Sequence, residues 1–316
     1  MDFRDLRYFQ AVAEQGSYSR AADVLRISQP ALSRAVQRLE LDLDVSLFER
    51  HGHGARLTES GRALIERANG LLRQLEQARA EVRGGIETPS GVLDFAVPPG
   101  AATYLVPPVI MALQAAYPNV FLRVHEGFSG QLSDWIARGQ VDLACINDPI
   151  PMRGVAATPL VDEELFLVGR DLSLKGPCAR IKDLADIPLI LPSRAHSLRR
   201  LIDGMVAEKR ITLDLRAEVD GQPIIKLLLR KGVGASLLTW GAIHEEVERG
   251  ELNALKFKPS LRWPLTLLER SDAIVFEPHI TLVETVKRVA RELIISGAWP
   301  GRALDGRPKQ KGKLTA

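Results

Sequence analysis

The sequence predicts an α/β protein of three consecutive parts: a small helical domain with a β-hairpin, one long helix, and a larger domain of two α/β lobes. Three observations predict this fold class. Apolar residues recur at helical spacing near the N-terminus, a seven-residue repeat follows Thr58, and beyond Gly91 short apolar runs typical of strands alternate with helical segments.

The composition is that of an ordinary globular protein. The chain has 316 residues, of which 46% are hydrophobic and 26% are charged, and this length favours two or three domains. No apolar run approaches the ~18 residues of a membrane span, and the charged start Met1-Asp2-Phe3 lacks the apolar core of a signal peptide. We therefore expect a cytoplasmic protein without a membrane partner. Cys145 and Cys178 are too few for a disulfide framework.

The net charge says little about partners. The formal charge is +3, but residues 1–90 hold 13 Arg against 13 Asp and Glu, and the excess lies in the tail after Pro300. An argument for nucleic acid must therefore rest on where the charges point. Apart from the chain terminus and any protonated His, the cations before Lys175 are all Arg. Arg can form the paired hydrogen bonds to phosphate and guanine that Lys cannot, although a compositional bias explains this equally well.

Three short helices open the chain. The spacing of apolar residues from Phe3 to Ala13 predicts a first helix, which Gly16 ends, and Ser17 or Ser19 can cap a short second helix. After a three-residue turn, Ser28 can cap a third helix. Two helices joined by such a turn have helix-turn-helix geometry.

The third helix has one apolar and one polar face. On a wheel of about 100° per residue, Val36 and Leu39 fall within roughly 40° of Leu32 and form the buried stripe. The first turn, the far side and its flank carry the remaining candidates: Gln29, Pro30, Ser33, Arg34, Gln37 and Arg38. Reading of the major groove needs such a face near the start of a helix, although a polar helix face by itself is more often only solvated.

A β-hairpin is expected next. Two short extended pieces around a glycine-rich tip predict a wing beside the helices. Arg50 and Arg56 could reach flanking phosphates, contacts that position a protein without reading sequence. His51-Gly52-His53 invites a metal site, but two ligands without a nearby Cys or carboxylate cluster do not complete one. We therefore predict no metal.

These residues together resemble a known family. The resemblance is to the DNA-binding domain of LysR-type regulators, over about sixty residues, in the runs Gly16-Ser17-x-x-x-Ala21-Ala22-x-x-Leu25-x-x-Ser28-Gln29-Pro30-Ala31-Leu32-Ser33, Leu39-Glu40, Leu47-Phe48-x-Arg50 and Leu57-Thr58-x-x-Gly61. The chain departs from the family at Asp44-Val45-Ser46, where a Gly usually precedes the Leu-Phe pair. The resemblance implies a winged helix-turn-helix over residues 1–58.

The resemblance also implies roles for single residues. It implies that Gln29, Pro30, Ser33 and Arg34 contact operator DNA and that Arg50 lies on the phosphate backbone. By their positions Gln37, Arg38 and Arg56 complete the predicted DNA-binding set.

Residues 59–86 predict one long helix, which Thr58 can cap and Gly84-Gly85 can end. Small and apolar residues recur along it with alternating spacings of three and four: Gly61, Leu64, Ala68, Leu71, Leu75, Ala78 and Val82. Such a narrow heptad seam favours pairing with a second copy, and two recognition helices one DNA turn apart would suit a palindrome. Packing of the seam against its own chain is the alternative. The resemblance implies a dimer-forming linker helix.

Beyond the hinge-like stretch 86–91, strands and helices alternate. The expected elements are strands at 92–97, 120–124 and 141–146, helices at 102–116 and 129–138, two strands near 155–169, a second series from Leu189 to about Leu255 that includes the segment 226–231 and the strand 233–239, a strand at 265–268 and a helix near 280–296. This alternation predicts a parallel sheet covered on both faces.

The expected effector domain spans residues 92–300. Lobe I should comprise residues 92–161 and 266–300, lobe II residues 162–265, with ligands bound at the carboxyl ends of strands between them. Residues 301–316 predict a disordered basic tail.

This half resembles the LysR-type effector domain, itself similar to periplasmic solute-binding folds. It resembles the nitrogen-assimilation control branch in particular, through Glu126-Gly127-Phe128-Ser129-Gly130-x-Leu132-x-x-Trp135, Gly139-x-x-Asp142-Leu143-Ala144 and Leu191-Pro192-Ser193-x-x-His196-x-Leu198-Arg199.

Strand ends supply eight candidate effector-binding residues: Gly100, Ala101, Phe128, Ser129, Asn147, Ser193, His196 and Ser197. Ser129 and Ser197 could open helices, whose free N–H groups favour an anion, so an anionic effector is expected. Some relatives carry hydroxyl or amide side chains where this chain has Gly100 and Ala101, and the loss of these side-chain donors argues against a purely sulfate-like ligand. Each residue could instead serve as an ordinary loop or capping residue, and His196 is better explained as a hydrogen-bonding loop residue than as a catalyst.

The sequence thus predicts a sequence-specific transcription regulator modulated by a small-molecule effector in an interlobe cleft. The expected partners are double-stranded DNA, the effector, RNA polymerase and further copies of the chain, as a homodimer or, by the resemblance, a tetramer. No cofactor is expected. An enzyme with an appended DNA-binding domain is one alternative, but GxSxG, GxGxxG, HExxH and phosphate-loop motifs are absent. A solute-binding protein is another, which the first ninety residues and the missing export signal oppose.

Overall fold

The fold is described from a computed structural model, which describes residues 2–51, 54–84, 91–172, 174, 176–271 and 277–304. The chain divides into two compact units. The first is Met1–Gly91 with the short segment Arg138–Gln140, and the second is Val92–Ala137 with Val141–Ala316. No helix among the described residues is long and apolar enough to cross a membrane.

The first unit begins with the three predicted short helices. Its elements are α1 (Phe3–Gln15), α2 (Tyr18–Leu25), α3 (Gln29–Leu43), β1 (Phe48–His51), β2 (Gly54–Leu57) and α4 (Glu59–Gly84). Gly16 ends α1 with a φ of 58°, a left-handed conformation that glycine adopts without strain. The hydroxyl of Ser17 then accepts the amide of Arg20 and caps α2, so Ser17 rather than Ser19 is the cap.

The core of this unit joins all four helices. Leu6 and Phe9 of α1 pack with Leu39 of α3 and with Leu47, in a cluster that also buries Ala68 and Leu72 of α4. A second cluster joins α1, α2 and α3 through Val12, Ala21, Ala22, Leu32 and Val36. Because α4 contributes to the first cluster, its N-terminal half belongs to the same folded body as the helix-turn-helix.

The seam predicted on α4 is therefore divided. Gly61 and Ala68 are buried within the chain's own first unit, so for these positions the alternative of packing against the same chain is correct. Leu71 remains 40% exposed. The side chains of Ala78 and Val82 lie outside the described residues. Thr58 caps the helix as predicted, because its hydroxyl accepts the amide of Gly61 at 3.0 Å.

The second unit alternates strands and helices. Its elements are β3 (Gly91–Val97), α5 (Pro99–Ala116), β4 (Val120–Glu126), α6 (Ser129–Ala137), β5 (Leu143–Asn147), β6 (Val155–Gly169), the 3₁₀ helix η1 (Ile181–Asp186), β7 (Pro188–Leu191), α7 (Ser197–Glu208), β8 (Asp214–Glu218), α8 (Gln222–Arg230), β9 (Ala235–Thr239), α9 (Trp240–Glu248), β10 (Asn253–Lys256), β11 (Arg262–Arg270), α10 (Glu277–Ile295) and β12 (Gly301–Ala303).

The sheet is mixed rather than wholly parallel. Its strand order is β4-β3-β5-β11-β6-β9-β7-β8, with β10 and β12 also paired to β6. The pairs β3–β5 and β7–β8 are parallel, as alternating strands and helices predict, but β11 runs antiparallel to β5. The expectation of a parallel sheet is wrong at this point, because β11 returns from the second lobe and enters the first from the opposite end.

Residues 155–169 form one strand where we expected two. The first part of β6 pairs with β11 up to Glu164, and its last residues pair with β9 from Leu165 onward. One uninterrupted strand therefore changes partners between the two lobes. With 15 residues, β6 is longer than the 3–10 residues of most strands.

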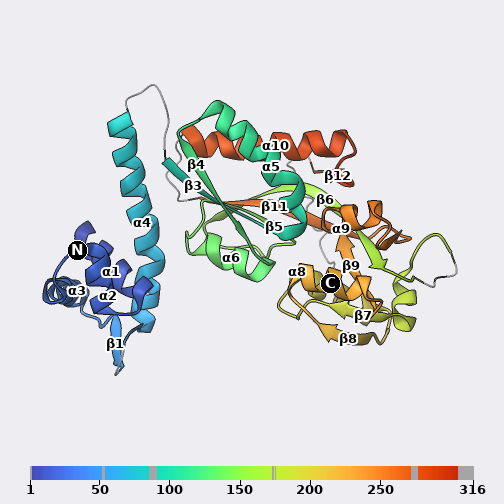
Figure 1. The fold of residues 1–316 in the computed structure, drawn as a ribbon, viewed down its shortest axis with the longest axis horizontal. Helices are drawn as coiled ribbons and strands as arrows, with labels where there is room; N and C mark the ends of the chain where they lie inside the picture. The colour runs from blue at the N-terminus through green and yellow to red at the C-terminus, as the bar shows by residue number, and fades with distance from the viewer. Residues whose placement is uncertain are drawn as a thin grey trace, which may run out of the picture. The chain divides into compact units, whose positions relative to one another are not determined.

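Helices cover both faces of each lobe (Figure 1). In the first lobe, α5 and α10 pack on the face that carries Phe95 and Cys145, and α6 packs on the face that carries Ala96 and Ala144. Neighbouring residues of one strand thus serve opposite faces, as the two-residue period of a strand requires. In the second lobe, α7 covers one face and α8 and α9 the other.

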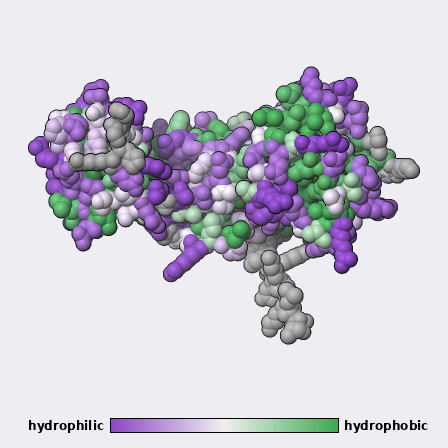
Figure 2. Space-filling model, turned by 90° about the horizontal axis from the view of Figure 1, so that it is seen from below, coloured by the Kyte–Doolittle hydropathy of each residue, from purple (hydrophilic) through white to green (hydrophobic). Residues whose placement is uncertain are grey.

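On the face shown in Figure 2, the first unit is mostly hydrophilic, whereas hydrophobic residues gather on the second lobe of the second unit. Ile224 and Leu227 of α8 are among the exposed apolar side chains of that lobe.

The first residues of the C-terminal tail have regular structure. Gly301–Ala303 form β12, which pairs antiparallel with β6, and Trp299 before it is buried. The prediction of a disordered tail from residue 301 is therefore wrong for these three residues, because β6 still has an edge that can accept another strand. Residues 305–316 lie outside the described residues.

Candidate functional site

The third helix separates its apolar and polar faces as the sequence predicts. Four apolar residues of α3 are almost fully buried, namely Leu32, Ala35, Val36 and Leu39, whereas Leu41 near its C-terminal end is 80% exposed. On the other face Gln29, Pro30, Arg34, Gln37 and Arg38 are exposed, and Ser33 is half-buried. The polar face is therefore available to a partner of the first unit.

The turn before α3 holds the start of the helix at the surface. Arg26 takes a left-handed φ of 55° and Ser28 takes the extended conformation of an N-cap residue. The hydroxyl of Ser28 makes no capping hydrogen bond, which differs from the sequence-based expectation. Pro30 in the first turn has no N–H that would need a partner.

Arg38 has a partner that the sequence did not reveal. Its Nη2 lies 2.7 Å from Oδ1 of Asp5 on α1, and the Asp5 side chain is only 9% exposed. Arg38 therefore fastens α3 to α1 while about half of its side chain remains exposed. The two residues are 33 positions apart, so no helical spacing relates them.

A groove lies between α3 and the wing. Gln29, Ser33 and Gln37 of α3 line it with Glu49 and Gly54 of the hairpin. The amide of Ala55 donates to the carbonyl of Gly16 at 2.9 Å and holds the wing against the helices. Glu49 was not predicted, and it adds a negative charge beside the polar face.

The predicted phosphate contacts are only partly described. Arg56 of β2 is exposed. The side chains of Arg50 and His51 are not described, and Gly52 and His53 lie outside the described residues. Within the described part of the chain, no group of three or more His, Cys, Asp or Glu is arranged to hold a metal ion.

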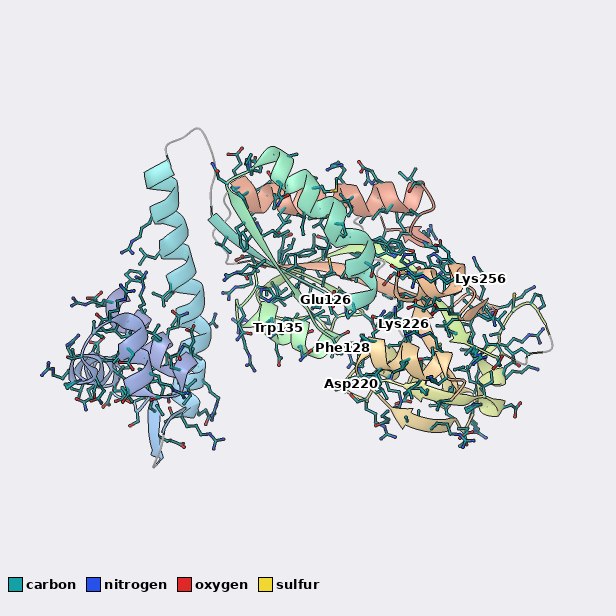
Figure 3. The ribbon with its side chains drawn as sticks, in the orientation of Figure 1. Glu126, Phe128, Trp135, Asp220, Lys226 and Lys256 are labelled. Atoms are coloured by element: carbon teal, nitrogen blue, oxygen red, sulfur yellow. The ribbon has the colours of Figure 1, made fainter. Side chains whose placement is uncertain are left out.

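A cleft lies between the two lobes of the second unit. Five predicted effector-binding residues line it: Gly100, Ala101, Phe128, Asn147 and His196. They lie at or shortly after the carboxyl ends of β3, β4, β5 and β7, where parallel sheets place their ligands. In Figure 3, Phe128 on one lobe and Asp220 on the other mark the two sides. The space within the cleft, counted together with the open solvent at its mouth, is about 530 Å³.

Three predicted residues do not line the cleft. Ser129 and Ser197 open α6 and α7 as expected, but their hydroxyls bond to each other at 2.7 Å, and both are buried. They fasten one lobe to the other. The amide of Ser193 donates to Oδ1 of Asp220 at 2.8 Å, so Ser193 holds a residue of the wall instead of forming it.

His196 packs among aromatic rings. Its ring centroid lies 5.0 Å from that of Phe128 and 5.8 Å from that of Trp263. Nδ1 accepts the amide of Leu198 and caps α7, so the neutral ring carries its proton on Nε2. Burial lowers the pKa of His196 to about 4, which keeps the ring neutral near pH 7.

Glu163 is the principal residue of the cleft that sequence reasoning missed. It lies on β6 in a fully buried position, where Asn147 Nδ2 donates to it at 2.7 Å and Trp299 Nε1 donates at 3.1 Å. Burial raises the pKa of Glu163 to about 7, against the lowering effect of these two hydrogen bonds. Nothing in its local sequence marked it, because only the crossing of β6 between the lobes brings it to the cleft.

Two glycines bring the lobes together at the cleft. A Cβ on Gly241 of α9 would meet the carbonyl oxygen of Gly100 and lie 3.0 Å from the ring of Tyr104, and a Cβ on Gly100 would lie 2.7 Å from Oγ1 of Thr239. Gly100 is therefore needed for close packing as well as for the cleft wall.

The chain matches two family models. One, described as the bacterial regulatory helix-turn-helix protein, lysR family, matches residues 3–62, and the LysR substrate binding domain matches residues 87–290. A similar solved structure is a full-length OxyR variant from Pseudomonas aeruginosa, with a TM-score of 0.71 and 24% identity over 92% of this chain and 95% of that one. At this identity the likeness shows the fold alone.

Two curated relatives are more similar in sequence. The HTH-type transcriptional regulator BbuR of Bordetella bronchiseptica is 32% identical over 300 residues, which cover 94% of this chain and 92% of the relative. The nitrogen assimilation regulatory protein nac of Escherichia coli is 32% identical over 239 residues, which cover 75% and 78%. These families and relatives are regulators rather than enzymes. By the two family matches and these relatives, the chain belongs to the LysR family of transcriptional regulators, with a helix-turn-helix DNA-binding domain and an effector-binding domain.

Proposed function

We propose that this chain controls transcription by reading a specific operator with the exposed face of α3, and that a small molecule between the two lobes modulates this activity. The observation that carries the proposal is the division of α3. Leu32, Val36 and Leu39 hold the helix in the core, while Gln29 and Arg34 stay exposed near its N-terminal end. A recognition helix needs this arrangement to enter a major groove.

The side chains on this face suit base edges. Gln can bond with two hydrogen bonds to adenine and Arg with two to guanine, and Ser can donate to or accept from several bases. We assign Gln29, Ser33, Arg34 and Gln37 to base reading, with Pro30 beside them. We assign Arg38, Arg50 and Arg56 to phosphates, although the bond from Arg38 to Asp5 gives it a structural role as well.

Dimerisation is part of the proposal. The buried part of α4 is used within the chain, but Leu71 is exposed and Leu75 half-buried further along the same seam. An exposed seam of this kind favours a second copy, and a homodimer would present two α3 helices to a palindrome. We further propose that two dimers form a tetramer and that the DNA-bound protein contacts RNA polymerase in the cytoplasm.

The effector would act by preferring one arrangement of the lobes. Gly100, Ala101, Phe128, Asn147 and His196 come from both lobes, so a ligand bound among them contacts both. A ligand shifts an equilibrium only as far as its affinities for the two states differ. A cleft that narrows around the ligand supplies that difference.

The experiment begins with selection of DNA from a random pool by the wild-type chain, which yields the preferred sequence. Arg34→Ala should then bind that sequence about 10- to 100-fold more weakly, because each paired contact to a base contributes about 1–3 kcal/mol. Arg67→Ala is the matched control, since Arg67 is exposed on α4. Equal binding by Arg34→Ala and wild type, measured by mobility shift at one salt concentration, would reject the proposal.

A further inference from the structure

The interlobe cleft is lined by carboxylates and aromatic rings. Glu163 contributes a carboxyl group from the part of β6 that pairs with β11, and Asp220 contributes one from the segment before α8, while no Lys or Arg is among the described residues that line the cleft. Arg200 lies close enough to His196 to affect its pKa, but it donates to the carbonyl of Ala195 and is not part of the lining. The side-chain charge of the walls is therefore negative.

On the α6 and α7 side, one amide near the start of each helix already has a partner within the chain. The amide of Phe128, before α6, donates to Oε1 of Gln131 at 3.3 Å, and the amide of Leu198 in α7 donates to His196. Ser129 and Ser197 donate to or accept from each other. An anion would have to compete with these partners for the Phe128 and Leu198 amides, which belong to the N–H groups that usually hold an anion.

Proline removes N–H donors from the starts of the other two helices. α5 starts with Pro99 after Pro98, and neither has an N–H, while the amide of Ala101 donates to the carbonyl of Pro98 at 3.0 Å. α8 carries Pro223 at its second position. The carboxylate of Asp220 lies just before α8, where it would repel an anion and already accepts the amide of Ser193.

The same walls suit a cation with a planar body. The rings of Phe128, His196 and Trp263 form a row with centroid separations of 5.0 and 5.8 Å. The faces of Phe and Trp attract a cation within about 6 Å. Asp220, with one oxygen bound to the Ser193 amide, is the carboxylate that can pair with it.

Trp263 adds a requirement for a hydrogen-bond acceptor. It lines the cleft and is 7% exposed, yet its Nε1–H has no hydrogen-bond partner in the described structure. A buried donor without a partner costs free energy, which a ligand oxygen would recover.

We propose that the effector is a small organic cation, an amine or amidine on a planar or apolar body that carries a hydrogen-bond acceptor. Its cationic group pairs with Asp220, its body packs on the rings of Phe128 and Trp263, and its acceptor takes the Trp263 N–H. This inference rests on the proposed function only in treating the cleft as the effector site, and it replaces the anionic effector expected from the sequence.

The test uses three probes that share one ring and one phenolic oxygen and differ in charge: 4-hydroxybenzamidine, 4-hydroxybenzamide and 4-hydroxybenzoate. Binding to the full-length chain is measured by isothermal titration calorimetry at pH 7.5. We expect the amidinium to bind at least about tenfold more tightly than the carboxylate, as a charge-assisted hydrogen bond allows. Equal affinities, tighter binding of the carboxylate, or no binding of any probe would overturn the inference.

Two variants locate the effect. Asp220→Asn keeps an oxygen for the Ser193 amide but removes the charge, and it should weaken amidinium binding about tenfold and leave the neutral amide unchanged. Asp214→Asn is the control, because Asp214 pairs with Arg216 on β8 and does not line the cleft. Equal loss in both variants would show that the selectivity does not arise at Asp220 and would overturn the assignment.

DNA binding separates this inference from the proposed function. Without probe, Asp220→Asn should bind the selected operator as the wild type does. A chain that binds its operator but prefers the carboxylate probe contradicts only the inference. A chain that prefers the amidinium but shows no dependence on Arg34 contradicts only the proposed function.

Discussion

Two glycines on α4 should respond in opposite directions to the same substitution. A Cβ on Gly61 would lie directly against the carbonyl oxygen of Leu47 and 2.9 Å from Cδ2 of Leu57, whereas a Cβ on Gly70 meets nothing within 4 Å. In an open helix, Ala is favoured over Gly by about 0.5–1 kcal/mol. At Gly61 this gain is opposed by overpacking, which costs about 1–3 kcal/mol in well-packed sites.

The expected changes follow from these two effects. Gly70→Ala should raise the free energy of unfolding of the first unit by about 0.5–1 kcal/mol. Gly61→Ala should lower it by about 1 kcal/mol, because α4 must move away from the backbone before β1 and cannot do so without leaving the core shared with Phe9 and Leu39. The two variants should therefore differ by roughly 2 kcal/mol.

Urea unfolding with two signals makes this measurable. The four tryptophans all lie in the second unit: Trp135, Trp240, Trp263 and Trp299. Their fluorescence follows that unit alone, whereas ellipticity at 222 nm follows both. For a small domain that loses about 1–3 kcal/mol per molar urea, the ellipticity midpoints of the two variants should differ by roughly 1 M while the fluorescence midpoints coincide.

The reasoning would be refuted by equal or parallel shifts. If Gly61→Ala stabilised the first unit as Gly70→Ala does, the close contact between α4 and Leu47 would not exist in solution. If both variants moved the fluorescence transition, the two units would not unfold separately.

Three further changes test other parts of the structure. Burial raises the pKa of Glu163 to about 7, above the ~4.3 of an unfolded Glu, so the stability that its bound proton contributes is lost as the pH rises from the unfolded to the folded pKa. The wild-type free energy of unfolding minus that of Glu163→Gln should therefore fall by about 3 kcal/mol from pH 4.5 to 7. The opposite contribution of His196 is the same in both proteins and cancels in this difference. A difference that stays constant with pH would count against the raised pKa. Arg38→Ala should destabilise the first unit by about 1–2 kcal/mol because it leaves the buried carboxylate of Asp5 without its partner, while Arg38→Lys should restore much of the loss. The test is the urea midpoint followed by ellipticity, and an unchanged midpoint for Arg38→Ala would show that the pair contributes nothing. Leu71→Glu should turn dimers into monomers by light scattering, without a shift of the unfolding midpoint at low concentration, because Leu71 is exposed within one chain; a dimer that persists would remove the seam from the proposal.

The sequence predicted local features reliably where one short segment carries the whole signal. Gly16 and Ser17 mark the end of one helix and the start of the next. The stripe of Leu32, Val36 and Leu39 predicted both faces of α3, since helical periodicity needs only the residues of that helix. Five of the eight candidate cleft residues were found in the same way, because strand ends and the turns after them can be read from the chain itself.

The tertiary structure alone decided which distant residues meet. Asp5 and Arg38, Ser129 and Ser197, and Glu163 with its partners are brought together by packing of elements that lie far apart in the chain. The sequence favoured pairing of α4 with a second copy, yet Gly61 and Ala68 are buried against the first unit, because an apolar helix face has the same pattern whichever surface covers it.

The sequence by itself therefore determined the helix-turn-helix, its exposed polar face and the family to which the chain belongs. It did not determine the charge of the cleft. The free N–H groups of a helix start can be predicted from sequence, but their use by Gln131 and His196, and the approach of Glu163 and Asp220 from separate segments of the chain, depend on the folded backbone. Periodicity acts over a few residues, whereas the electrostatic character of a cleft is a sum over side chains that only the fold makes neighbours.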